Sequence, residues 1–195
     1  MIEKLFEEFP SRLKPQSLLL NKGDTLFNQG DSVNNIYFIK TGKIKLIRNT
    51  SDGTPVVLHI GHQGEFIAEA SLFSDQYHCS ATVDSVSELS YVKKQDLIQI
   101  LNDKPDIMMA LLALFSRQVR DLRAINEIKN IRSAKERILT YIKSNANENK
   151  ELKLDHSLKD IAAKIGLAHE TLYRELKSLE KSGELQRNAD HIKLP

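Results

Sequence analysis

Six of the eight glycines lie between positions 23 and 64, where they separate short runs of β-branched and aromatic residues. Polar sequences such as Lys-Gly-Asp and Gln-Gly-Asp surround several of these glycines and favour tight turns. The runs cover residues 25–27, 36–39, 44–47, 56–60, 81–83 and 89–92. Many short strands at this spacing predict an antiparallel sandwich or barrel across residues 16–92, with a turn at residues 41–43.

After Pro105 the apolar residues recur every three or four positions instead. The stripe consists of Met108, Leu112, Phe115, Val119 and Leu122, and it is widened by Leu111, Leu114, Ile125 and Ile128. This spacing predicts an amphipathic helix from about Asp106 to Asn130. Because the apolar face is wide, we expect part of it to pack on its own domain and part on the same helix of a second copy. A helix buried wholly within its own domain is the alternative.

A second helix is expected to start directly after the long one. Ser133 and Glu136 have the spacing of a capping box and precede an apolar run, so a hinge is predicted at residues 131–133. We therefore expect one domain over residues 1–130 and a separate domain over residues 131–195, with a loop at 145–150. The second part has 13 Lys and Arg against 10 Asp and Glu, whereas residues 1–130 have 15 against 16. The weak basic excess favours the second part as the one that meets phosphate.

Residues 157–183 have the pattern of two short helices joined by a glycine turn. Ser157 is placed to cap the first helix, and Gly166 is placed to end it with a positive φ. Leu172, Leu176 and Leu179 predict the buried face of the second helix. Two helices joined in this way are the geometry that places a recognition helix in the major groove. Residues 185–187 and 191–194 then predict a β-hairpin wing.

The outward residues of the second helix have the chemistry needed to contact bases. Arg174 can donate two hydrogen bonds to guanine, and Glu170, four residues earlier, can accept one from cytosine. Thr171 and Lys159 are expected to bind phosphates and fix the register. The alternative is that Glu170 and Arg174 form an ordinary surface salt bridge on a purely structural helical pair.

The single cysteine, Cys79, limits the chemistry open to the chain. It excludes an intrachain disulfide and any four-cysteine zinc or iron–sulfur site, and it favours a reducing, cytoplasmic compartment. No apolar run is long enough to span a bilayer, so no membrane association is expected. No phosphate-cradling glycine motif, metal-ligand cluster or nucleophile elbow is present, so we do not expect an enzyme.

The order of these parts closely resembles the Crp/Fnr superfamily of transcription regulators. The resemblance rests on the segments 22–31, 36–42, 64–73 and 170–180 and extends over nearly the whole chain. It implies an α+β chain with a cyclic-nucleotide-binding-type β-roll (a double-stranded jelly roll), a long dimerisation helix and a C-terminal winged helix-turn-helix. It also implies a homodimer that binds an inverted-repeat operator and RNA polymerase.

The resemblance assigns roles to individual residues of the DNA-binding part. Glu170 and Arg174 become base readers, with His169 at the position of a further base-reading arginine. Lys135 and Asn188 join Thr171 and Lys159 as expected phosphate contacts. Because His169 replaces an arginine, we predict weaker guanine selectivity at the outer position of the half-site. Ala168 stands where a Ser or Thr cap is usual.

The effector pocket implied by the resemblance lacks its main charge. Nucleotide-binding members have Gly-Glu followed by an Arg-Ser pair, whereas this chain has Ala68-Glu69 and Cys79-Ser80. Leu122 and Arg123 stand where the cyclic-AMP receptor protein presents Thr-Ser to the adenine. Losing a guanidinium opposite a phosphate costs several kcal/mol, so we expect an effector other than cyclic AMP. Arg123 could supply the missing positive charge from another direction, so a different anionic effector is left open.

Heme or nitric oxide is also left open as the effector. The segment 66–70 is similar to nitrosative-stress regulators, and His59, His62 and His78 lie in the sensing domain. Each histidine is more simply an exposed strand or loop residue, and Cys79 is more simply a small core residue than a redox-reactive thiol. A rival class is a cyclic-nucleotide-binding-like module that acts through protein contacts, which would not need the recognition helix and wing.

Overall fold

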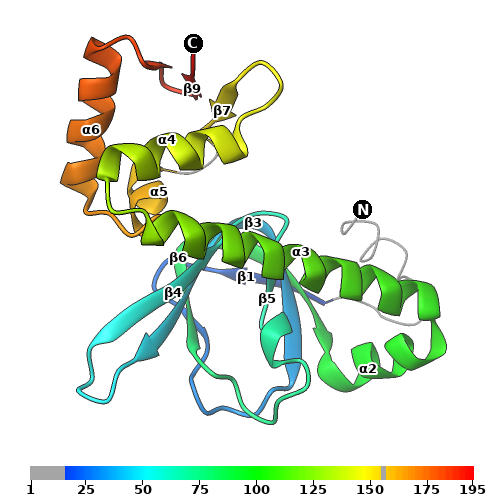
Figure 1. Cartoon of the computed structure of the whole chain (residues 1–195). Helices are drawn as coiled ribbons and strands as arrows, with labels where there is room; N and C mark the ends of the chain where they lie inside the picture. Colours follow the sequence, from blue (N-terminus) through cyan, green and yellow to red (C-terminus); the bar gives the residue numbers. More distant parts are fainter. Residues whose placement is uncertain (1–15, 155–156) are drawn as a thin grey trace. The chain divides into compact units, whose positions relative to one another are not determined.

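The computed structural model describes residues 16–154 and 157–195 (Figure 1). The chain divides into two compact units, Met1–Leu114 and Phe115–Pro195. The division falls inside the long helix, upstream of the boundary expected at residue 131, because the end of this helix packs into the core of the second unit.

The first unit is an antiparallel sheet structure, as the glycine-separated runs predict. Its strands pair in the order β1-β6-β3-β4, and β2 pairs with β6 and β5 with β3. The strands are β1 (Gln16–Leu20), β2 (Thr25–Phe27), β3 (Asn35–Asn49), β4 (Pro55–Gly61), β5 (Phe66–Ile67) and β6 (Ser80–Lys93). A short 3-10 helix, η1 (Glu69–Ser71), follows β5. The helix α2 (Lys94–Asp103), which the sequence analysis missed, follows β6.

The turn expected at residues 41–43 is wrong, because β3 runs through it without ending. The pairing of β3 with β6 shifts register between Ile39 and Ile44, so the extra residues form bulges. Gly42 has φ +93°, and a Cβ added there would lie 2.1 Å from the Ser87 Oγ. Glycine therefore permits a close approach of two strands here, and the two runs on either side form one long strand.

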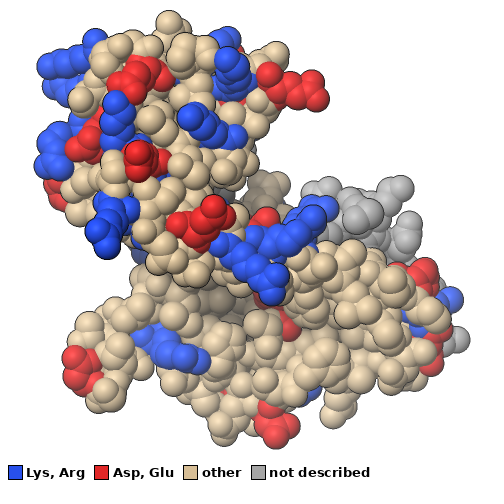
Figure 2. Space-filling view, in the orientation of Figure 1, with Lys and Arg blue, Asp and Glu red and all other residues tan. Residues whose placement is uncertain are grey.

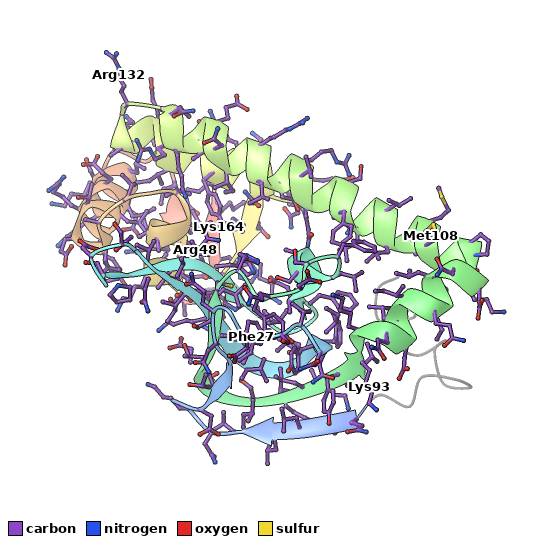
Figure 3. The ribbon with its side chains drawn as sticks, turned by 90° about the horizontal axis from the view of Figure 1, so that it is seen from below. Phe27, Arg48, Lys93, Met108, Arg132 and Lys164 are labelled. Carbon is purple, nitrogen blue, oxygen red and sulfur yellow. The ribbon has the colours of Figure 1, made fainter. Side chains whose placement is uncertain are left out.

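The core of the first unit is formed by side chains from both ends of its sequence. Phe27 is 6% exposed, and its ring stacks on Tyr77 with centroids 3.8 Å apart. Figure 3 shows Phe27 among the packed side chains of this unit. Burial, the neighbouring Tyr77 hydroxyl and other contacts raise the pKa of Tyr37, so this phenol stays protonated in the core.

The long helix α3 (Pro105–Asn130) has the bounds predicted from the sequence. Leu111 is buried in the first unit and Ile128 in the second, at 8% and 3% exposure. Of its apolar stripe, Met108, Leu112, Val119 and Leu122 remain exposed in the single chain, as does Met109, whereas Leu114, Phe115 and Ile125 are half-buried. A helix buried wholly within its own chain is therefore not what the structure has.

The second unit contains three further helices and a small sheet. The helices are α4 (Ala134–Asn145), α5 (Leu158–Lys164) and α6 (His169–Lys181). The strands β7 (Glu151–Lys153), β9 (His191–Lys193) and β8 (Gln186–Arg187) pair in that order. Strands β8 and β9 confirm the predicted wing, whereas β7 was not expected and adds a third strand. No helix among residues 16–154 and 157–195 is long and apolar enough to cross a membrane.

Candidate nucleic-acid interface and sensor cassette

Helices α5 and α6 have the expected arrangement of a helix-turn-helix. The Ser157 Oγ accepts a hydrogen bond from the Asp160 amide at 3.1 Å, which caps α5. Gly166 has φ +68° and follows α5, as predicted for the tight turn. Leu172, Leu176 and Leu179 are each 1% exposed and anchor α6 in the core of the second unit. The first residues of α6 are thereby fixed relative to the turn.

The face of α6 opposite these leucines carries charged side chains. Glu170 and Arg174 are both exposed and lie one helical turn apart. The Arg174 side chain is 71% exposed, and its Nε lies 3.5 Å from the Glu175 Oε1. Among the described residues, no ion pair joins Glu170 to Arg174, so the two side chains do not satisfy one another. The surface salt bridge considered as the alternative is therefore not formed.

His169 occupies a different side of α6 from Glu170 and Arg174. Its ring is half-buried and lies edge-on to Tyr173, with ring centroids 4.5 Å apart. Ala168 precedes it as the N-cap residue and provides no side-chain cap, as the sequence predicts. The structure thus brings Glu170 and Arg174 together on the outer face and holds His169 beside an aromatic ring.

The residues expected to contact phosphates differ in their exposure and in whether their side chains already bind other groups of the protein. Lys159 is exposed at the start of α5, and Thr171 is half-buried near the start of α6. The Lys135 Nζ forms an ion pair with Glu184 at 2.8 Å, which, with a Ser182 hydrogen bond, lowers the pKa of that carboxyl. The Asn188 Oδ1 accepts hydrogen bonds from the amides of Asp190 and His191 at 2.9 and 2.7 Å. Asn188 therefore shapes the wing turn.

Lysine and arginine side chains are mixed with acidic ones over the second unit (Figure 2). On α6, Lys177 and Lys181 are exposed and extend the face that carries Arg174. The electrostatic attraction for a phosphate backbone is therefore local to this helix and is not a property of the whole chain, whose net charge is only +2.

Arg137 connects three parts of the second unit, a role that the sequence analysis missed. Its Nε and Nη2 donate to the carbonyl of Ile131, just after α3, at 3.1 and 2.6 Å. Its Nη1 donates to the carbonyls of Ile165 and Gly166 at 3.3 and 2.9 Å. The guanidinium thus fastens the helix-turn-helix turn to the end of α3. The predicted Ser133 cap of α4 is confirmed, because its Oγ accepts from the Glu136 amide at 3.3 Å.

The segment from Ala68 to Ser80, called the cassette below, links β5 to the start of β6 and carries three of the expected pocket residues. Ala68 has φ +72° and ψ +5°, a left-handed conformation that favours glycine over residues with a Cβ. Glu69 is half-buried at the start of η1. Cys79 is 2% exposed, and burial raises the pKa of its thiol. The Ser80 Oγ accepts from the Gln29 amide at 2.9 Å. Cys79 therefore behaves as a core residue.

A guanidinium does reach the cassette, but from β3. The Arg48 Nε donates to the His78 carbonyl at 3.0 Å, and its charge acts on both His78 and Cys79. Arg48 was missed because its place depends on strand register: its neighbour Ile47 pairs with Ser80. Leu122 and Arg123, the other expected pocket residues, are exposed on the part of α3 that belongs to the second unit.

The histidines of the first unit have partners within the protein. The His59 Nε2 lies 2.7 Å from the Glu65 Oε2, and the His78 Nδ1 lies 2.9 Å from the Ser71 Oγ. Partial loss of water around the ring, and then the Arg48 charge, lower the pKa of His78. Across residues 16–154 and 157–195, no three His, Cys, Asp or Glu side chains gather as a metal site would require.

Comparison with known proteins agrees with this architecture. Residues 18–104 match the cyclic nucleotide-binding domain family. The transcriptional activator protein FnrA of Stutzerimonas stutzeri is 23% identical over 185 residues, 90% of this chain and 75% of the relative. The cAMP-activated global transcriptional regulator CRP of Escherichia coli is 34% identical over 101 residues, which span 49% of this chain and about half (47%) of that relative. The structure of FixK2 from Bradyrhizobium japonicum has a TM-score of 0.70 at 20% identity, covering 92% of both chains.

A nucleotide-binding-type β-roll, a long helix and a winged helix-turn-helix together define a transcription regulator with an N-terminal sensor domain. The named relatives are themselves transcription regulators and not enzymes. Over most of its length the chain is therefore similar to transcription regulators of the Crp/Fnr family.

Proposed function

We propose that the chain binds an inverted-repeat operator as a homodimer and that α6 enters the major groove of each half-site. Glu170 and Arg174 read a G·C pair there, the guanidinium donating to guanine and the carboxylate accepting from cytosine. The observation that carries this proposal is their exposure, one turn apart, on the side of α6 opposite its three buried leucines.

The same docking brings several side chains to the phosphate backbone. Lys159 and Thr171 contact phosphates through free donors, whereas Lys135 first has to leave Glu184. Asn188 acts mainly by shaping the wing turn. His169, turned toward Tyr173, provides weaker guanine selectivity at the outer position than an arginine would.

The dimer forms through the exposed apolar stripe of α3. Met108, Leu112, Val119 and Leu122 recur at the spacing with which two helices pack, and nothing within the described chain covers them. Similarity to the Crp/Fnr regulators supports the dimer, RNA polymerase as a further partner and a cytoplasmic location.

We infer that the effector is not cyclic AMP. The relative named for activation by cAMP matches only about half of its own length. In this chain the cassette position that carries an arginine in nucleotide-binding members is the buried Cys79. A thiol cannot replace a charge-assisted contact to a phosphate.

Heme or nitric oxide is an effector class that the sequence leaves open. His59 and His78 are engaged with Glu65 and Ser71, so ligation of iron requires one of these contacts to break. An absorption spectrum of anaerobically purified protein, with and without heme and nitric oxide, tests this class. A Soret shift that is lost in a His59→Ala or His78→Ala variant supports it, and an unchanged free-heme spectrum contradicts it.

The DNA-binding proposal is tested by operator selection followed by gel shifts at several salt concentrations. We expect a two-fold symmetric sequence with a required G·C pair in each half-site, and an affinity that falls steeply as salt rises. A regulatory module that acts through protein contacts would show weak binding without sequence preference, and that result would contradict the proposal.

A further inference from the structure

The wing and the recognition helix are joined by a two-pronged ion pair. Arg187 on β8 donates from its Nε to the Glu180 Oε1 and from its Nη2 to the Glu180 Oε2, both at 3.1 Å. The two side chains are only 20% and 28% exposed. A bidentate, charge-assisted contact with little access to water fixes both the distance and the orientation of the groups it joins.

An aromatic side chain extends this contact along α6. The Arg187 guanidinium carbon lies 5.7 Å from the centre of the Tyr173 ring, within the range of a cation–π contact. The Tyr173 ring also contacts the ring of His169, the first residue of α6. Tyr173, Glu180 and Arg187, called the wing lock below, therefore connect the start of the recognition helix to the wing.

The wing turn needs such a connection because it does not pack tightly onto α6. A groove of about 660 Å³ lies between the wing and the helices, lined by Leu154, Leu158, Tyr173, Glu180, Arg187 and Asn188. Leu185 and Ile192 anchor the two strands in the core, but the turn between the strands lies beside this open space. All three residues of the wing lock line this groove, together with Asn188 of the wing turn.

We propose that Arg187 and Glu180 are positioning residues for DNA binding: they hold the wing turn at the distance from α6 at which both contact the operator together. The Glu180 carboxylate neutralises the charge of Arg187. A direct contact between Arg187 and a phosphate is therefore not how it contributes to operator affinity. This inference rests on the proposed function, since it concerns how the same interface is held in shape.

Glu180→Gln gives the sharpest test, because the two explanations predict opposite signs. Loss of the bidentate pair should weaken operator binding about tenfold, although a negative charge near the DNA has been removed. If Arg187 instead served as a phosphate contact, Glu180→Gln would release it and tighten binding. Asp190→Asn is the matched control: it removes one acidic charge from the wing without touching the wing lock, and should bind equally or slightly more tightly.

Arg187→Lys and Arg187→Met provide the second arm. A lysine keeps the charge but has no planar fork, so both variants should lose affinity to a similar extent if position matters. Combining Arg187→Met with Glu180→Gln should cost no more than either alone, since both remove the same contact. Thermal unfolding, followed for every variant, verifies that the second unit stays folded, and Tyr173→Phe should retain most of the affinity.

Binding of Glu180→Gln as tight as that of Asp190→Asn would overturn the wing lock. So would a wild-type affinity of Arg187→Lys combined with a loss in Arg187→Met. A parallel measurement on the Arg174→Ala variant separates this failure from that of the proposed function. If that variant also keeps full operator preference, then α6 is not the recognition helix.

Discussion

Helix α6 and the cassette between β5 and β6 both follow the pattern of the Crp/Fnr family, but they differ in which charged side chains they keep. Helix α6 retains an exposed acid and guanidinium at the start of a helix anchored by three leucines. The cassette has a left-handed residue at position 68, and the buried thiol of Cys79 stands where the resemblance implies a guanidinium.

The difference shows that fold and ligand chemistry can separate within one chain. The backbone of the cassette is maintained by strand pairing and by its core, so it survives the loss of the charge that a cyclic phosphate needs. The proposed reading face of α6 has no such independence, because the base contacts would be made by its exposed side chains directly. We therefore expect changes on α6 and α3 to alter DNA binding, and cyclic AMP to leave the chain unaffected.

The largest effect is expected from the apolar stripe of α3. Leu122→Glu places a charge where a second helix should pack, and burial of two symmetry-related leucines contributes several kcal/mol, so self-association should weaken at least about a hundredfold. Analytical ultracentrifugation measures this change. Ala124→Glu, on the other side of α3, is the control and should remain dimeric. Wild-type association of Leu122→Glu would mean that another surface forms the dimer.

A smaller effect is expected when Arg137 is removed. Arg137→Ala leaves the carbonyls of Ile131, Ile165 and Gly166 without the donor that now serves all three. We expect the free energy of unfolding of the second unit to fall by about 2 kcal/mol, with weaker operator binding, in denaturant titrations followed by circular dichroism. The lysine of Arg137→Lys can donate to only some of these carbonyls. Its stability and operator affinity should therefore lie between those of the wild type and Arg137→Ala. No change in either quantity would show that the turn is held without the guanidinium.

We expect that the cassette does not bind cyclic AMP. Without a guanidinium at position 79 the cyclic phosphate loses several kcal/mol of binding, so calorimetry should show no saturable heat up to about 1 mM ligand. If binding is nevertheless seen, Arg48→Gln shows whether the guanidinium from β3 replaces the missing charge. Saturable binding that survives Arg48→Gln contradicts the comparison between the two regions.

The smallest effect concerns the backbone of the cassette. Ala68 adopts a left-handed conformation that costs a residue with a Cβ about 1 kcal/mol relative to glycine. Ala68→Gly should therefore stabilise the first unit by roughly 1 kcal/mol in a urea titration without creating cyclic AMP binding. Destabilisation would indicate that the Ala68 methyl group, which is buried, contributes more through packing than the conformation costs.

Features that depend on local sequence were predicted well. The bounds of α3, the caps at Ser133 and Ser157 and the positive φ of Gly166 each follow from a few neighbouring residues. The three buried leucines of α6 follow from helical periodicity in the same way.

Features that depend on contacts between distant segments were not predicted. The continuity of β3 through Gly42 is decided by its close approach to β6, and the third strand β7 by its pairing with β9. Arg48 meets the cassette only once strand register is fixed, and Arg187, although only seven residues after Glu180, meets it only once the wing packs beside α6. These contacts could not be predicted from the sequence, because no periodicity or motif spacing relates the residues that form them.

The most direct measurement is the operator affinity of a double variant, Glu170→Ala with Arg174→Ala, compared with the wild type on the preferred sequence and on one with the G·C pair replaced. The account predicts that the double variant remains a folded dimer, binds the preferred sequence more weakly by about 1–3 kcal/mol per lost base contact and no longer distinguishes the two sequences. Unchanged affinity together with unchanged discrimination would contradict it.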